Sequence, residues 1–247
     1  MTALEIHTRP SPNHDNRGDP ARIDMLVLHY TGMRNAQAAL ERLCDPEARV
    51  SAHYVVEENG RIWSLVPEDR RAFHAGLSCW EGESDLNPVS IGIEIVNPGH
   101  EWGYRPFPEP QMFSVERLCQ DLIARHPIPP HRVVGHSDIA PDRKIDPGEL
   151  FDWPRLARAG IGIWPRAEPP LPGHETDGDG ALTTLRAIGY CAGLEAPEAA
   201  LIAFQRHFRP ACCDGRLDFE TAARLIEVRA AFDKSRARSH VGGQNVV

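Results

Sequence analysis

The sequence predicts an α/β domain followed by a small helical module. Short β-rich segments alternate with amphipathic helical patterns over residues 1–165, which is typical of a layered α/β domain. Residues 166–180 are rich in Pro, Gly and acidic side chains and are interpreted as a linker. Residues 181–232 carry the apolar spacing of two or three helices. Residues 233–247 are polar and are expected to form a flexible tail.

The first half of the chain supplies the clearest elements. Met25–His29 is a short apolar run and predicts a buried strand, and residues 35–43 follow with helical spacing of their apolar side chains. Val50–Glu57 and Arg61–Val66 are β-rich segments separated by a turn that contains Asn-Gly. This pair of residues between two β-rich runs is a strong signal for a hairpin.

Three more elements complete the predicted α/β domain. Residues 89–96 (VSIGIEIV) predict a strand that places Glu94 on the face opposite three isoleucines. Ser114 is expected to cap a helix that runs to about Arg125. Residues 133–134 then form a last short strand.

Composition excludes several classes of protein. Lys and Arg number 27 and Asp and Glu 35, so the net charge is −8, and nucleic acid is not expected as a partner. No apolar run approaches the roughly 18 residues of a membrane helix, so no membrane association is expected. The start of the chain lacks the pattern of a secretory signal, and we therefore expect a cytoplasmic protein. The oligomeric state is left open.

The cysteines are expected to be reduced thiols. None belongs to a C-x-x-C pair, which argues against a cysteine-based zinc site or redox motif. Without a secretory signal, a reducing compartment is favoured over one in which disulfides persist. The six residues are Cys44, Cys79, Cys119, Cys191, Cys212 and Cys213.

Side chains that can bind a metal gather where the predicted strands end. His29 closes the first strand, and His136 and Asp146 lie in the segment after the last one. Two histidines and one carboxylate suit a catalytic zinc, because a fourth position stays open for water. Glu94 is then the candidate base and Lys144 the candidate cation for an oxyanion. From spacing alone, structural hydrogen bonding by the histidines remains the alternative.

Four segments occur in an order that resembles a known family. They are LVLHYTG, VSAHYVVEENGRIWSLVPEDRRAFHAG, NPVSIGIEIVNPG and GHSDIAPDRKIDPG, and they span roughly residues 20–165. Together they resemble the zinc-dependent type 2 N-acetylmuramoyl-L-alanine amidases, to which the peptidoglycan recognition proteins are related. The resemblance implies a central mixed β-sheet flanked by helices, with zinc in a groove at one sheet edge. It also implies hydrolysis of the amide between N-acetylmuramic acid and L-alanine of the stem peptide.

The resemblance assigns a role to each residue of this group. It implies that His29, His136 and Asp146 hold one zinc ion and that Glu94 and Lys144 are catalytic. The residue types fit this reaction independently. Amide hydrolysis needs a Lewis acid, a nucleophile derived from water and a proton for the departing amine.

Other residues match positions near the family's groove and are expected to bind substrate. These are His53, His74 and Asn87. A buried histidine bonded to backbone is the alternative for His53, and a plain turn residue is the alternative for Asn87. The last segment departs from the family's usual APGRKTDPG at Asp142 and Ile145, and neither residue is a ligand.

The C-terminal segment has a resemblance of its own. LRAIGY, AALIAFQRHF and CDGRLDFETAARL are similar to the three-helix peptidoglycan-binding domain of cell-wall hydrolases. The same positions would serve any small helical bundle. The partner implied by both resemblances is a muropeptide or peptidoglycan.

Three functions follow as hypotheses. The leading hypothesis is hydrolysis of muropeptides. The alternatives are a recognition protein that binds muropeptides without cutting them and a peptidase that cuts within the stem peptide. A cytoplasmic location implies imported 1,6-anhydro-muropeptides and a role in cell-wall recycling. A peptidoglycan-binding module implies intact peptidoglycan in the periplasm instead.

Overall fold

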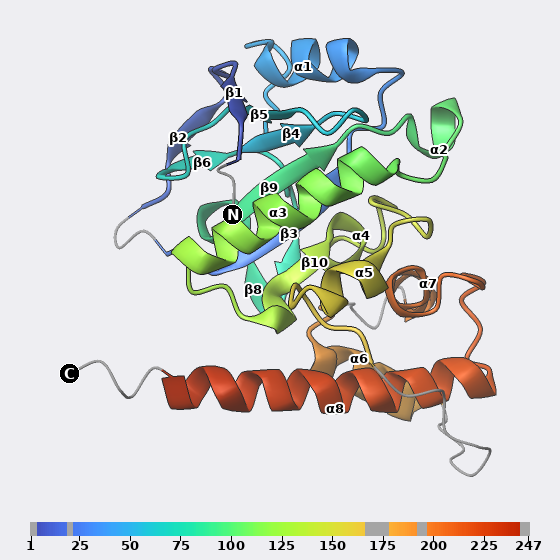
Figure 1. Ribbon diagram of the computed structural model, residues 1–247. Coiled ribbons are helices and arrows are strands. Elements are labelled where there is room, and N and C mark those ends of the chain that lie inside the picture. The colour runs from blue at the N-terminus through green and yellow to red at the C-terminus, as the bar shows by residue number, and fades with distance from the viewer. Residues whose placement is uncertain (1–3, 19–21, 166–177, 192–196, 243–247) are drawn as a thin grey trace.

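A mixed β-sheet forms the centre of the molecule (Figure 1), as predicted. The computed structural model describes residues 4–18, 22–165, 178–191 and 197–242, and within them this sheet has six strands in the order β1-β5-β4-β9-β3-β10. β4 and β5 run antiparallel, whereas the other neighbouring pairs are parallel. In sheet order the strands are Ile6–Thr8, Ile62–Ser64, Tyr54–Val56, Ser90–Ile95, Met25–Tyr30 and Val133–Gly135.

Short sheets and helices surround the central sheet. The small sheets pair β2 (His14–Asn16) with β6 (Arg70–Ala72) and β7 (Cys79–Trp80) with β8 (Glu83–Ser84). Short 3-10 helices, η1 (Asn87–Val89) and η2 (Pro130–Arg132), precede β9 and β10. No helix in the described part of the chain combines the length and apolar character needed to cross a membrane. The α-helices are α1 Ala36–Cys44, α2 Gly99–Trp102, α3 Glu109–Arg125, α4 His136–Ile139, α5 Trp153–Arg158, α6 Gly178–Ile188, α7 Pro197–Phe208 and α8 Phe219–Gly242.

The predicted hairpin is confirmed. β4 and β5 are joined by a turn in which the side-chain oxygen of Asn59 accepts the backbone N–H of Arg61 at 2.8 Å. Gly60 has φ +87°, a left-handed conformation that glycine adopts without steric cost. A Cβ there would lie 2.7 Å from the carbonyl oxygen of Pro110, so the turn also packs against α3.

Helix α3 covers one face of the sheet (Figure 1). Successive residues of a strand point to opposite faces, and the even-numbered apolar residues of β3 and the isoleucines of β9 share one buried cluster with this helix. The members that make this contact are Leu26, Leu28, Ile91, Ile93, Ile95, Met112, Val115, Leu118 and Leu122.

The predicted start of this helix at Ser114 is wrong, because α3 begins at Glu109. Pro110 fits the first turn, whose N–H groups have no acceptor within the helix. The hydroxyl of Ser114 instead donates to the carbonyl oxygen of Gly60 at 2.7 Å. This hydrogen bond therefore joins α3 to the hairpin turn.

The C-terminal helices pack on the other face of the sheet. Met25 and Val27 of β3 and Val134 of β10 belong to the same buried cluster as Leu185 of α6 and Phe204 of α7. Figure 1 shows α8 alongside α6, below the rest of the molecule. One of the buried clusters is thus shared between the α/β domain and the helical module.

The structure describes only part of the predicted linker and of the predicted tail. Most of residues 166–180 lies outside the described residues. The tail predicted at 233–247 is wrong over its first part, because α8 stays helical to Gly242. Ser235 is buried there, and its hydroxyl lies 2.9 Å from Nδ1 of His131. Contact with the α/β domain therefore stabilises a polar segment that has little apolar signal of its own.

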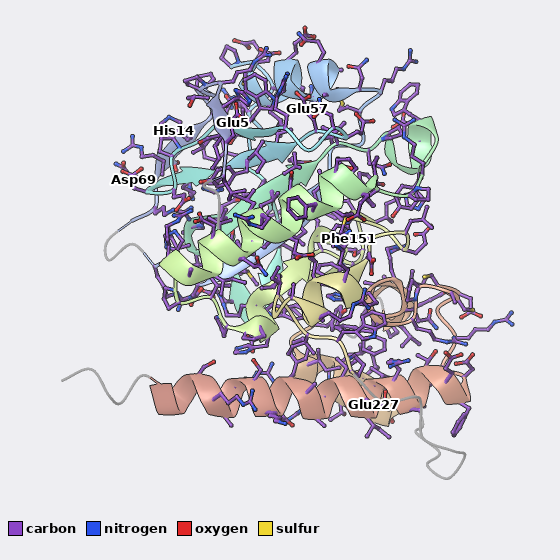
Figure 2. All side chains as sticks on the ribbon, viewed as in Figure 1. Glu5, His14, Glu57, Asp69, Phe151 and Glu227 are labelled. Atoms are coloured by element: carbon purple, nitrogen blue, oxygen red, sulfur yellow. A yellow bond between two sulfur atoms is a disulfide. The ribbon has the colours of Figure 1, made fainter. Side chains whose placement is uncertain are left out.

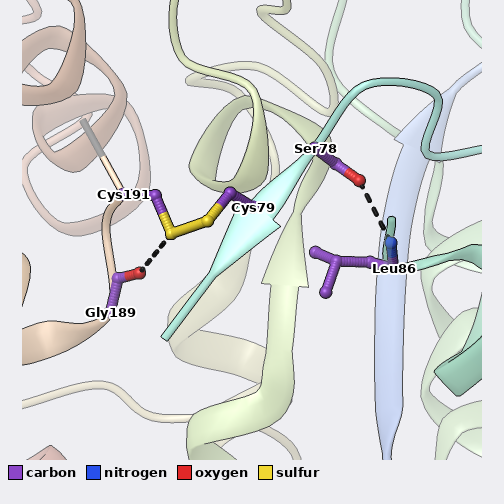
Figure 3. The surroundings of a disulfide bond; sticks show 5 residues. All are labelled: Ser78, Cys79, Leu86, Gly189 and Cys191. Carbon is purple, nitrogen blue, oxygen red and sulfur yellow. Dashed lines mark hydrogen bonds between the residues drawn. A yellow bond between two sulfur atoms is a disulfide. The ribbon is translucent and has the colours of Figure 1, made fainter. Parts of the chain in front are cut away.

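A disulfide bond joins Cys79 of β7 to Cys191, which follows α6 (Figure 3). The prediction of reduced thiols is therefore wrong for this pair. The two residues are 112 positions apart, but folding brings their Cα atoms to 5.7 Å, within the range that a disulfide can span. Sequence spacing carries no information about this approach. The free cysteines of the described chain are Cys44, Cys119, Cys212 and Cys213.

Breaking this disulfide is expected to destabilise the fold. A Cys191→Ser variant should lose about 2–4 kcal/mol of unfolding free energy, because the bond closes a long loop in the unfolded chain. Chemical denaturation of the oxidised protein measures the loss. A Cys212→Ser variant is the control and should differ from wild type by less than about 0.5 kcal/mol. Reductant should destabilise the wild type and leave Cys191→Ser unchanged, and equal wild-type stability in both conditions would contradict the expectation.

Candidate active site

The predicted metal ligands meet at one edge of the sheet. β9, β3 and β10 are parallel neighbours, so their carboxyl ends lie on the same side. His29 is near the end of β3, opposite Glu94 of β9 in the strand register. His136 begins α4 directly after β10, and Asp146 comes from the loop that follows.

Three side-chain atoms form a small triangle there. The Nδ1 atoms of His29 and His136 are 2.8 Å apart and lie 3.1 and 3.0 Å, respectively, from Oδ2 of Asp146. All three residues are buried. Among the described residues, these are the three His, Cys, Asp or Glu side chains close enough together to hold one metal ion.

The hydrogen bond on the far side of His136 decides which of its nitrogens carries the proton. Nε2 lies 3.1 Å from the carbonyl oxygen of Ala75, which can only accept, so Nε2 donates. In the neutral ring, Nδ1 is then an acceptor. It is this Nδ1 atom that belongs to the triangle.

A chain of hydrogen bonds sets the proton of His29 in the same way. The hydroxyl of Ser90 donates to the carbonyl oxygen of Leu86 at 2.6 Å, so Oγ accepts from Nε2 of His74 at 3.2 Å. Nδ1 of His74 then accepts from Nε2 of His29 at 3.1 Å. The remaining nitrogen of His29, Nδ1, is left as a lone-pair donor to a metal.

Burial and charge prepare the triangle for a cation. Burial, together with the charge that His136 carries when protonated, lowers the pKa of His29 to about 4, so this ring is neutral at neutral pH. Burial by itself raises the pKa of Asp146, but His136 and His29 lower it far below its usual range. Two imidazole lone pairs and a carboxylate oxygen this close repel one another unless a cation lies among them. The donor set fits zinc with one open position.

Glu94 is the acidic residue next to this triangle. It lines the cavity, and its Oε2 atom is shielded from solvent without a hydrogen-bond partner in the described chain. Burial and the negative charge of Asp146 raise the pKa of Glu94 well above its usual value, whereas the charge of Lys144 opposes this. A shielded carboxylate with a free oxygen is suited to exchange a proton with a bound ligand.

The site opens into a cavity of about 420 Å³, a size typical of small-molecule sites. Glu94, His136 and Asp146 line it together with Lys144, which places the predicted catalytic pair beside the ligands. Ile145, one of the departures from the family pattern, also lines the cavity and is partly exposed.

The residues predicted to bind substrate differ in position. His74 lines the cavity, as expected, and it also supports His29. His53 is fully buried and is absent from the described lining of the cavity. Its Nδ1 accepts the backbone N–H of Gly92 at 3.0 Å, and its Nε2 lies 2.7 Å from Nη2 of Arg17. His53 thus forms the backbone hydrogen bond of the alternative reading, and its contact with substrate stays a prediction.

Asn87 likewise binds backbone groups, and its contact with substrate stays a prediction. Its side-chain oxygen accepts the backbone N–H groups of His74 and Ala75 at 3.1 and 2.9 Å, and it does not line the described cavity. Asn87 instead fixes the segment that carries both His74 and the carbonyl group that orients His136.

Three residues that support the site were not predicted from the sequence. Ser90 ends the chain of hydrogen bonds from His29. A Cβ at Gly92 would lie 2.4 Å from the His74 ring, so glycine alone leaves room for that ring. Arg143 donates to the carbonyl oxygen of Ala75 at 2.6 Å. Of these three residues, only Gly92 has a recognisable signal in the sequence. A glycine within a strand of branched residues indicates that other atoms approach the strand closely.

Comparison with known proteins gives one family throughout. The family model for N-acetylmuramoyl-L-alanine amidase (Amidase_2) matches residues 19–149. The N-acetylmuramoyl-L-alanine amidase AmiD of Escherichia coli K12 is 40% identical over 225 residues, which cover 82% of this chain and 80% of that protein. The 1,6-anhydro-N-acetylmuramyl-L-alanine amidase AmpD of Haemophilus influenzae is 37% identical over 59% of this chain and 86% of that protein.

Solved structures agree. The complex of E. coli AmiD with anhydro-N-acetylmuramic acid-L-Ala-D-gamma-Glu-L-Lys superposes with a TM-score of 0.76 at 38% identity, covering 85% of this chain and 91% of AmiD. AMPDH3 from Pseudomonas aeruginosa also has a TM-score of 0.76, at 34% identity, covering 90% of this chain and 95% of that one. Both matches extend over more of the chain than the α/β domain alone.

Removing one ligand is expected to abolish stoichiometric metal binding. A His136→Ala variant leaves two of the three ligand atoms, too few for a stable site of this kind. Elemental analysis after dialysis against Zn²⁺ should show about one equivalent in the wild type and far less in the variant. His7→Ala, on β1 and outside the site, is the matched control and should bind like the wild type. Full metal content in His136→Ala would show that the triangle is not the binding site.

Proposed function

The chain belongs to the N-acetylmuramoyl-L-alanine amidase family, and we propose that it cleaves the amide bond between N-acetylmuramic acid, in its 1,6-anhydro form, and L-alanine of the stem peptide. The observation that carries the proposal is the triangle of His29, His136 and Asp146, with Glu94 beside it at the cavity. The anhydromuramyl ligand in the AmiD complex supports the substrate class.

We propose zinc as the metal held by the three ligands. Bound there, zinc supplies Lewis acidity, which polarises an amide carbonyl and makes water more acidic. The protein residues divide the remaining work. His74 and Ala75 orient the two imidazoles, and the cavity admits the substrate beside them.

Glu94 is the proposed proton carrier. Its free Oε2 atom can take the proton of the attacking water and return it to the departing amine of L-alanine. The raised pKa suits the first step, because a carboxylate that holds its proton more tightly is a better base. The positive charges of Lys144 and of a bound dication both favour the ionised form of Glu94, which is the form that can accept a proton from water.

Lys144 is the proposed stabiliser of the negative charge that develops on the amide oxygen. Its side chain lines the cavity with Asp146 and His136. Its backbone N–H donates to the carbonyl oxygen of Ala140 at 3.0 Å, which fixes the loop that carries it. A positive charge held at that place acts on the oxyanion directly.

Hydrolysis is favoured over recognition without cutting. A protein that only binds muropeptides has no need for three buried ligands and a shielded, unpaired carboxylate, which cost stability unless they have a function. A peptidase acting within the stem peptide would use the same chemistry. The product distinguishes it from an amidase.

The compartment is a further part of the proposal. The Cys79–Cys191 disulfide supports an oxidising compartment such as the periplasm, the alternative to the cytoplasm that the sequence left open. The resemblance of the C-terminal helices to peptidoglycan-binding domains supports a substrate in the cell wall, in addition to soluble fragments. Cell fractionation combined with thiol trapping tests this, and a cytoplasmic pool with both cysteines reduced would favour recycling of imported fragments.

Replacing the proposed base should separate chemistry from metal binding. Glu94→Gln keeps the shape of the side chain but cannot take a proton, so turnover should fall on the order of 10²–10⁴-fold. Zinc content should stay at the wild-type level, because Glu94 is not a ligand. Steady-state hydrolysis and elemental analysis of the same sample measure the two quantities. Glu5→Gln, at an exposed residue absent from the described lining of the cavity, serves as the matched control. A full rate in Glu94→Gln would exclude Glu94 as the base.

The products define the bond that is cut. Mass spectrometry of a digest of anhydro-N-acetylmuramyl peptide should show free anhydro-N-acetylmuramic acid and an intact peptide that begins with L-alanine. Fragments cut between amino acids would establish a peptidase instead. Unchanged substrate with retained binding, seen by calorimetry, would establish a recognition protein.

A further inference from the structure

The residue two positions after the ligand His136 is a buried aspartate that mediates a contact between the two parts of the chain. Asp138 is 1% exposed, and both oxygens of its carboxylate are engaged. Oδ1 accepts the hydroxyl of Tyr190 at 2.6 Å. Oδ2 accepts Nδ1–H of His207 and the backbone N–H of Gly135, each at 2.7 Å. Two of the three donors therefore come from the C-terminal helical region.

Asp138 is connected to the ligand His136 through short covalent and hydrogen-bonded paths. The backbone N–H that it accepts belongs to Gly135, the residue directly before His136. α4 is a single turn of four residues, closed by the N–H of Ala140 on the carbonyl of His136 at 3.1 Å. Ser137, which follows His136, donates its backbone N–H to the backbone carbonyl of another ligand, Asp146, at 2.9 Å. A shift of the Asp138 side chain therefore moves the turn on which His136 stands.

Tyr190 is fixed on its own side by several contacts. Its backbone forms a bridge with Trp80, and the two rings lie 5.1 Å apart at a steep angle. The next residue, Cys191, carries the disulfide to Cys79 (Figure 3). Burial and the negative charge of Asp138 raise the pKa of Tyr190 well above its usual value, so the hydroxyl keeps the proton that it donates.

His207 is fixed equally well. Its ring stacks on Trp153 of α5 at 3.8 Å, and Trp153 in turn contacts Phe151, which is labelled in Figure 2. Nε2 of His207 is buried without a partner among the residues that the structure describes. The bond to Asp138 is thus the hydrogen bond for which this imidazole is oriented, since packing alone would be served better by an apolar ring.

We propose that Tyr190 and His207 are positioning residues of the metal site, which hold Asp138 and through it the orientation of His136. The proposal rests on the proposed function, because it takes the triangle as the site of zinc. It assigns the C-terminal helices a part in building the active site, apart from any binding of peptidoglycan. Groups that hydrogen-bond metal ligands directly contribute about 10–100-fold to metal affinity, and we expect the lower end of this range for two residues that act through Asp138.

Two conservative variants test the proposal. Tyr190→Phe removes only the hydroxyl and keeps the contact with Trp80, and His207→Leu removes the Nδ1–H donor. Zinc affinity, measured by competition with a chromophoric chelator, should fall about 10-fold or more in each. With zinc in excess, kcat for anhydro-N-acetylmuramyl peptide should fall while KM stays within about twofold, because neither residue lines the described cavity.

A rescue and a matched control separate positioning from stability. His207→Asn keeps an N–H donor near the place of Nδ1 and should recover most of the affinity for zinc. Gln205→Ala is the control on the same helix, because Gln205 is fully buried and holds Gly215 and Arg216 instead of Asp138. It should lower the melting temperature and leave zinc affinity unchanged.

The outcomes are distinct. Wild-type zinc affinity in a folded Tyr190→Phe, or an equal loss of affinity in Gln205→Ala, would overturn the positioning role. Tyr190→Phe removes one atom and answers the question even when His207→Leu does not fold. A wild type that binds no zinc or leaves the substrate intact would instead overturn the proposed function, so the two failures are told apart.

Discussion

The structure depends on one electrostatic constraint, the meeting of three buried acceptor atoms at a single point. The Nδ1 atoms of His29 and His136 and the Oδ2 atom of Asp146 lie within 3.1 Å of one another. Such a group is unfavourable without a positive charge at its centre, because each atom presents electron density to the others. The fold must therefore hold the three side chains together against their mutual repulsion.

Much of the surrounding structure serves this purpose. Outward-facing partners bind the far nitrogen of each imidazole, and so leave the inward nitrogen free to coordinate. His74, placed by the space above Gly92 and by Asn87, performs this task for His29. The carbonyl of Ala75 performs it for His136, within the same short segment. A loop with no metal-binding pattern of its own therefore sets the protonation of both ligands.

The helical C-terminal region reaches the same site from the opposite side. It shares a hydrophobic cluster with β3 and β10, a disulfide with β7 and hydrogen bonds with Asp138. An appended module that folded on its own would need none of these links.

Local periodicity and distinctive motifs were enough to predict the α/β class, the hairpin and the five residues that the fold brings together at the cavity, namely His29, Glu94, His136, Lys144 and Asp146. The sequence did not reveal the disulfide, the helical extension of α8 or the hydrogen-bond partners of His53 and Asn87. These depend on which side chains meet across 12 to 112 positions of sequence. Only tertiary packing decides such meetings, since burial and hydrogen-bond partners are properties of the folded neighbourhood and leave no period in the chain.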